Sequence, residues 1–250
     1  MKKIKDRTGE EKINFQGCLM KIIHYDTNKN LTVQFQDKNG YIVYHVNYNA
    51  FKNGSIKNPF CPNICGIGYL GLTSMIDSNG KRKDSYRMWC GMLERCYKSN
   101  VTQYYSYKDC FVCEEWHCYA NFEQWYNKNY YEIDGERMNL DKDILVKGNK
   151  IYSPDTCIFT PSIINCLFVK CSNNENSFLG VNYNKKYDNY YVRVNVKGKK
   201  KHVGVYNTKE EAFIAYKQFK ENYIKSVADE YKDKIPKKLY DALYNWKVEK

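Results

Sequence analysis

The N-terminal part of the chain alternates apolar and polar side chains with the two-residue period of β-strands. The apolar positions fall in three short runs, Met20–Ile23, Leu31–Phe35 and Tyr41–Tyr44. Turn-forming residues separate the runs at Asp26–Asn30 and Asp37–Gly40. Such a series of short hairpins is typical of a small barrel or curled sheet. We therefore predict a small β-barrel-like domain over residues 1–73.

The pattern changes to a helical period at residue 85. The positions that share one helical face are Tyr86, Trp89, Met92, Leu93 and Cys96. A second helix is predicted over Tyr119–Tyr130, followed by two short strands, near Leu140 and over Cys157–Phe159, and a further helix from Pro161. This mixture predicts an α+β module over residues 85–170, with the polar segment Ser74–Asp84 as the linker before it.

Residues 176–250 predict a three-stranded antiparallel sheet packed on a helix. The expected strands are Phe178–Val181, Tyr190–Val196 and His202–Tyr206. Thr208 and Glu211 form a T-x-x-E capping box at the start of the helix. In the middle strand the valines alternate with Tyr191, Arg193 and Asn195, so the valines are expected to face the helix. The predicted fold class of the whole chain is α+β.

The charge is positive and unevenly distributed. The formal net charge is +12, which suggests a polyanionic partner, but the abundance of Lys, Asn, Tyr and Ile is also typical of an AT-rich genome. The net charge is +4 over residues 1–79, +1 over 80–170 and +7 over 171–250. Residues 180–202 hold seven basic side chains against Asp188 alone. This concentration favours a nucleic-acid-binding surface on the predicted C-terminal sheet.

The side chains of this region have the chemistry that binds DNA. Arginine pairs with guanine edges and asparagine with adenine edges, while lysine neutralises phosphates. The predicted DNA-binding residues are Lys185, Lys186, Tyr191, Arg193, Asn195, Lys199, Lys200, Lys201 and His202. The alternative is a solvated outer face, which is usually charged in a two-layer domain.

The order of these residues resembles a known DNA-binding family. The segments that carry the resemblance are Gly180-Val181, Tyr191–Val194, His202–Thr208 and Glu211–Tyr216. They resemble the Apetala/ethylene-response-factor DNA-binding domain, which also occurs in phage and prophage endonucleases and integrases. The resemblance implies that the sheet lies in the major groove, with Arg193 and Asn195 facing the bases and His202 at a position of frequent aromatic contact. The scarcity of arginine departs from the family and bears on sequence specificity rather than on DNA affinity.

The middle segment resembles a phage-encoded module related to HNH homing endonucleases. The matching residues are Trp89, Met92, Arg95–Tyr97, Tyr107, Val112–Trp116, Phe122, Leu140–Asp143, Tyr152–Cys157 and Ile164-Asn165. HNH enzymes hold a divalent metal and use a histidine to activate water. This chain has no histidine between residues 118 and 201, and Thr156 stands where the central asparagine is expected. We therefore expect an inactive nuclease centre. The alternative is a Mg²⁺-dependent endonuclease with Asp141 and Asn165 on the metal and Lys142 on phosphate.

The cysteines predict reduced thiols. The chain has 11 cysteines, and its basic N-terminus lacks the apolar segment of a secretory signal. Cys110 and Cys113 have the spacing of zinc ligands, with His117 and Cys118 nearby, but a second C-x-x-C is missing. We expect buried thiols and no bound cofactor.

The expected location and partners follow from these patterns. No apolar stretch reaches the roughly 18 residues of a membrane span. We expect a cytoplasmic protein, encoded by a phage or prophage and acting in the bacterial host cell, with double-stranded DNA as its partner. A second alternative is an inhibitor that binds a host enzyme of nucleic-acid defence.

Overall fold

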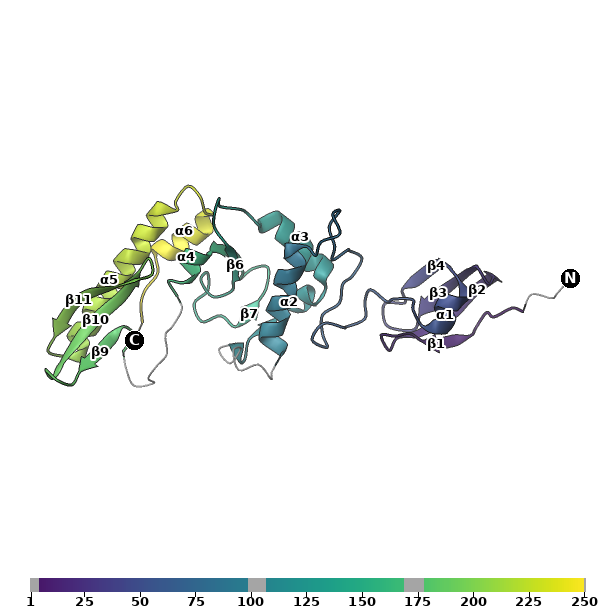
Figure 1. Cartoon of the computed structure of the whole chain (residues 1–250), viewed down its shortest axis with the longest axis horizontal. Coiled ribbons are helices and arrows are strands. Elements are labelled where there is room, and N and C mark those ends of the chain that lie inside the picture. Colours follow the sequence, from purple (N-terminus) through teal and green to yellow (C-terminus); the bar gives the residue numbers. More distant parts are fainter. Residues whose placement is uncertain (1–4, 99–106, 169–177, 250) are drawn as a thin grey trace. The chain divides into compact units, whose positions relative to one another are not determined.

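The computed structural model describes residues 5–98, 107–168 and 178–249. The chain forms two compact units, one of residues 1–128 with 151–153 and the other of residues 129–150 with 154–250. The fold mixes helices and strands, which confirms the predicted class at that level (Figure 1). Among the described helices, none combines the length and the apolar character needed to cross a membrane.

The first unit begins with a four-stranded antiparallel sheet. Its strands β1 (Glu11–Ile13), β2 (Leu19–Thr27), β3 (Asn30–Phe35) and β4 (Ile42–Val46) are neighbours in chain order. Alternate side chains of β2 and β3 form a core, which Phe51 of α1 (Tyr48–Asn53) joins. The predicted hairpins are confirmed. β1 was not predicted, because a run of three residues with two charges shows no apolar period.

The predicted barrel-like closure was wrong. In the described part of the chain, β1 pairs with β2 alone and β4 with β3 alone, so the sheet has two open edges. Four short strands are too few to close around a filled interior. The core is completed by Phe51 and Ile56 instead of by further strands.

The rest of the first unit is built around two helices, α2 (Asp84–Tyr97) and α3 (Tyr119–Asn129), which confirms both predicted helices. A 3₁₀ helix, η2 (Glu114–His117), precedes α3, and β5 (Phe111–Val112) pairs in parallel with β7 (Ile151–Tyr152). Trp89, Trp116 and Phe122 are fully buried. The Trp89 indole N–H donates to the Trp116 carbonyl at 2.7 Å, which ties α2 to the 3₁₀ helix.

The segment predicted as a linker is attached to α3. Glu123 of α3 is only 9% exposed. Its carboxylate accepts a hydrogen bond from Thr73 at 2.5 Å and pairs with the Lys83 ammonium at 2.8 Å. Burial alone would raise the pKa of Glu123, but the hydrogen bonds from Lys83, Thr73 and Tyr119 outweigh it and lower the pKa. One buried carboxylate therefore holds the residue just before the segment and a residue near the end of the segment.

The described residues of the second unit form a strand pair, a three-stranded sheet and three helices. The strands β6 (Met138–Asp141) and β8 (Ile158–Pro161) are antiparallel, and α4 (Ser162–Asn165) follows them. The sheet consists of β9 (Val181–Asn184), β10 (Asn189–Val196) and β11 (Lys199–Tyr206), with β10 in the middle. The helices α5 (Lys209–Glu230) and α6 (Lys237–Tyr244) complete the unit.

The predicted C-terminal sheet and helix are confirmed. The capping box of Thr208 and Glu211 is formed at the start of α5. β9 begins three residues later than predicted, because Gly180 has a φ of +75° and its turn ends before Val181. The N-terminal half of α5 packs on β9–β11 through Ala212, Phe213 and Tyr216.

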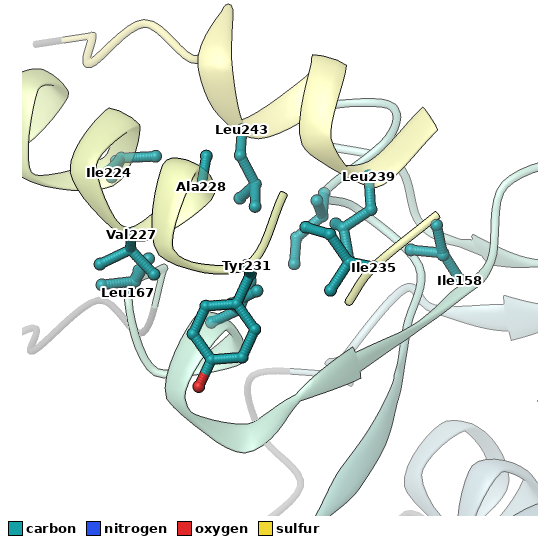
Figure 2. Close-up of a cluster of buried hydrophobic side chains, with 11 residues drawn as sticks. Ile158, Leu167, Ile224, Val227, Ala228, Tyr231, Ile235, Leu239 and Leu243 are labelled. Carbon is teal, nitrogen blue, oxygen red and sulfur yellow. The ribbon is translucent and has the colours of Figure 1, made fainter. Parts of the chain in front are cut away.

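The two halves of this unit share a second core, which lies between the C-terminal half of α5, α6 and the β6–β8–α4 region. Figure 2 shows Ile224, Val227, Leu239 and Leu243 gathered with Ile158 and Leu167. The division between the units at residues 128 and 129 coincides with neither predicted boundary. The three-module organisation stays a prediction.

Candidate nucleic-acid interface

The middle strand β10 has one buried and one exposed face, as predicted. Val192 and Val194 are 0% and 3% exposed and pack with α5. Arg193 and Asn195 are exposed on the opposite side, because successive side chains of a strand alternate between the two faces.

The strand register defines the exposed side of the sheet. Residues opposite each other in an antiparallel pair share a face. Tyr191, Arg193 and Asn195 of β10 are opposite Val205, His202 and Lys200 of β11, and Tyr191 is opposite Asn182 of β9. We call these seven residues the outer face: Asn182, Tyr191, Arg193, Asn195, Lys200, His202 and Val205. Asn182 was not singled out in the sequence, although it alternates with Val181 and Tyr183.

A β-bulge lies next to Arg193. The pairing passes from Val192 opposite Gly204 to Arg193 opposite His202, so Val203 has no partner residue on β10. A bulge bends and twists a strand and changes the direction of the neighbouring side chains. It is the reason that His202, rather than Val203, shares the outer face with Arg193.

The three consecutive lysines of β11 do not lie on one face. Lys199 and Lys201 are opposite Val196 and Val194, which face α5. The Lys201 ammonium is 5.3 Å from the ring of Phe219 on α5. Of these three predicted DNA-binding lysines, only Lys200 therefore lies on the outer face. Lys199 and Lys201 lie on the side of the sheet that faces the helix α5.

The other predicted residues come together near the β9–β10 turn. Lys185, Lys186, Tyr191, Arg193 and His202 line a depression of about 450 Å³. The Arg193 guanidinium carbon is 4.9 Å from the Tyr191 ring centre, within reach of a cation–π interaction. Asp188 is the only acidic residue from Val181 to Tyr206, and it accepts a hydrogen bond from the Tyr183 hydroxyl. The surface thus combines cations and amides with very little negative charge.

The candidate catalytic residues are Asp141, Lys142 and Asn165. Asp141 ends β6, and one of its carboxylate oxygens accepts backbone hydrogen bonds from Asp143 and Ile144, both at 2.8 Å. Lys142 is 8% exposed, with its ammonium 3.3 Å from the Asp143 carboxylate. Asn165 lies at the end of α4, and within the described residues no recorded contact joins its side chain to that of Asp141. The assignment of Asp141, Lys142 and Asn165 to a catalytic site stays a prediction.

Replacing Asp141 by asparagine is expected to stabilise the protein at pH 7. Burial, together with the Asp143 carboxylate, raises the pKa of Asp141 to about 6. The folded state therefore binds a proton that the unfolded state releases near pH 4, and stability falls as the pH rises from about 4 to about 6. Asparagine keeps an oxygen that can accept the two backbone hydrogen bonds from Asp143 and Ile144, but it carries no charge. We expect a gain of about 2 kcal/mol at pH 7 and little change at pH 4, measured by urea unfolding. An equal effect at both pH values would contradict this explanation.

The candidate zinc ligands lie near η2. Cys110 is 5% exposed and Cys113 is partly buried. The imidazole Nε2 of His117 lies 3.1 Å from the Val112 carbonyl, and its ring packs edge-on against Tyr97. Within residues 5–98, 107–168 and 178–249, no group of three His, Cys, Asp or Glu side chains could hold a metal ion. The expectation of no bound cofactor stays a prediction.

The outer face and the adjoining Lys185–Asp188 turn form the strongest candidate site of the described residues. They unite exposed cations, amides and an aromatic ring on one regular surface. The chain matches no protein-family model, no curated protein and no solved structure among those with which it was compared.

Proposed function

We propose that this chain is a phage or prophage protein that binds double-stranded DNA by placing the outer face in the major groove. The observation that carries the proposal is the gathering of Arg193, Asn195, Lys200 and His202 on one exposed sheet face. None of the three strands contains an acidic residue. A surface of this kind attracts the phosphate backbone and leaves its amides and guanidinium available to base edges.

The size of the sheet supports this docking. Neighbouring strands lie about 4.8 Å apart, so three strands span about 10 Å. The major groove of B-DNA is about 12 Å wide and accepts a narrow sheet. Lys185 and Lys186 at one turn and Lys200 on the edge strand β11 are then suited to contact phosphates on either side of the groove.

Salt is expected to weaken binding steeply. Each phosphate neutralised contributes about −0.9 to the slope of log K against log salt. Three phosphate contacts, from Lys185, Lys186 and Lys200, predict a loss of about 40-fold in affinity between 50 and 200 mM salt. Fluorescence anisotropy of a labelled duplex measures this slope.

Two adjacent lysines test the proposal. Lys200→Ala is expected to reduce the salt slope by about one, because it removes one phosphate contact. Lys201→Ala is the matched control: it removes the same charge one residue away, but Lys201 lies on the helix side. Equal effects of the two changes, or no binding to any duplex, would overturn the proposal. No observation on the described residues favours nuclease activity or a host protein partner, so we propose no second function.

A further inference from the structure

Two asparagine side chains on the outer face have no internal role. Asn182 and Asn195 are exposed, and neither side chain has a hydrogen-bond partner within the part of the chain that the structure describes. Their neighbour Asn184 differs, because its side-chain oxygen accepts a hydrogen bond from the Lys186 backbone at 3.2 Å. Asn182 and Asn195 are therefore the amides of this surface that are free to bind a ligand.

An asparagine amide without an internal partner can recognise one particular base in the major groove of DNA. Its NH₂ group donates to N7 of adenine, and its carbonyl accepts from the N6 amino group of the same base in the major groove. A guanidinium matches N7 and O6 of guanine in the same way. Lysine contacts to phosphate do not distinguish bases. We therefore assign base reading to the two amides and the guanidinium of this surface, those of Asn182, Asn195 and Arg193.

We propose that the outer face reads a guanine with adenines on both sides, with Arg193 on the guanine and Asn182 and Asn195 on the adenines. This inference rests on the proposed DNA binding and adds the class of target sequence. The Tyr191 ring beside the Arg193 guanidinium restricts the movement of that side chain, which favours one defined base contact.

The register sets the order and spacing of the contacts. Arg193 and Asn195 are two residues apart on β10, or about 6.7 Å at the rise of a strand. Asn182 is opposite Tyr191, on the other side of Arg193 along the strand direction. The three side chains thus extend over about 13 Å, the length of four residues. At about 3.4 Å per base pair, the target spans about four base-pair steps with the guanine between the adenines.

The first experiment is selection of bound sequences from random duplex DNA by the full-length chain. The expected result is a short motif with a guanine flanked by adenines within about four base-pair steps. A motif without adenine would overturn the inference. Equal binding to all duplexes would also overturn it, while leaving the proposed DNA binding intact. No binding to any duplex would overturn both.

The second experiment removes one acceptor atom from the DNA. An adenine of the selected motif is replaced by 7-deazaadenine, which keeps Watson–Crick pairing but lacks N7. The affinity is expected to fall several-fold, because one of the two hydrogen bonds of the bidentate pair is lost. In Asn195→Ala or Asn182→Ala, the same replacement at the adenine read by that residue is expected to cost nothing further. The matched control is Asn222→Ala, because Asn222 is exposed on α5 and does not belong to the sheet.

This comparison assigns each asparagine to a base. If the 7-deazaadenine penalty is the same in wild type and in both asparagine variants, the assignment is wrong. If Asn222→Ala abolishes the penalty as well, the effect is not local to the outer face and the assignment is equally wrong. Circular dichroism of each variant confirms that the sheet is folded.

Discussion

Gly180→Ala is expected to destabilise the C-terminal sheet by about 3 kcal/mol or more. Gly180 has a φ of +75°, a conformation in which a side chain costs about 1–2 kcal/mol. A Cβ atom there would also overlap the ring of Tyr216 on α5. Tyr216 is 6% exposed and packed in the core between sheet and helix, so its ring cannot move aside without opening that core. The loss of stability is measured by urea unfolding of the chain labelled with 5-fluorotryptophan, followed by the ¹⁹F NMR signal of Trp246. Trp246 is the only tryptophan of the second unit.

Gly198→Ala is the matched control for this prediction. Gly198 also has a positive φ, of +81°, but nothing lies within 4 Å of an added Cβ atom. We expect a loss of about 1 kcal/mol, from backbone strain alone. In a Tyr216→Ala background, Gly180→Ala should cost no more than Gly198→Ala, because the overlapping ring is gone. Similar losses for the two glycine variants in the wild-type background would show that contact with Tyr216 is not the cause.

This contact explains part of the sequence pattern. Gly180 and Tyr216 are far apart in the sequence. In the structure they meet where the turn before β9 packs on α5. The alternation of valines in β10 and the Thr208 capping box are local features, and for this reason the sequence was sufficient to predict β10, α5 and the two faces of the sheet.

Other features depend on contacts that no local pattern reveals. The bulge at Val203 changes the register by one residue, which placed His202 on the outer face and left Lys199 and Lys201 on the helix side. The polar segment that resembles a linker is bound to α3, because the buried carboxylate of Glu123 contacts Thr73 and Lys83. The motif position of Asp141 does not reveal that one of its carboxylate oxygens accepts hydrogen bonds from its own turn.

Ile224→Ala is expected to destabilise the second unit by about 2–5 kcal/mol, as is typical of a buried isoleucine. Ile224 of α5 is 1% exposed and lies in the core of Figure 2 together with Leu167, Leu239 and Ile158. Since this core joins α5 and α6 to the β6–β8–α4 region, both parts should lose protection together. Hydrogen exchange followed by mass spectrometry measures protection separately in β6, β8 and α5.

The same helix supplies the control. Ile214 of α5 is 64% exposed, so Ile214→Ala removes the same atoms without opening a cavity, and we expect a change within about 0.5 kcal/mol. If Ile224→Ala lowered protection in α5 and α6 but left β6 and β8 unchanged, residues 129–168 would fold independently of the C-terminal helices. That outcome would favour a separate middle module, as the sequence predicts. Joint loss of protection would instead mean that the C-terminal sheet and residues 129–168 are stabilised by one continuous helix, α5.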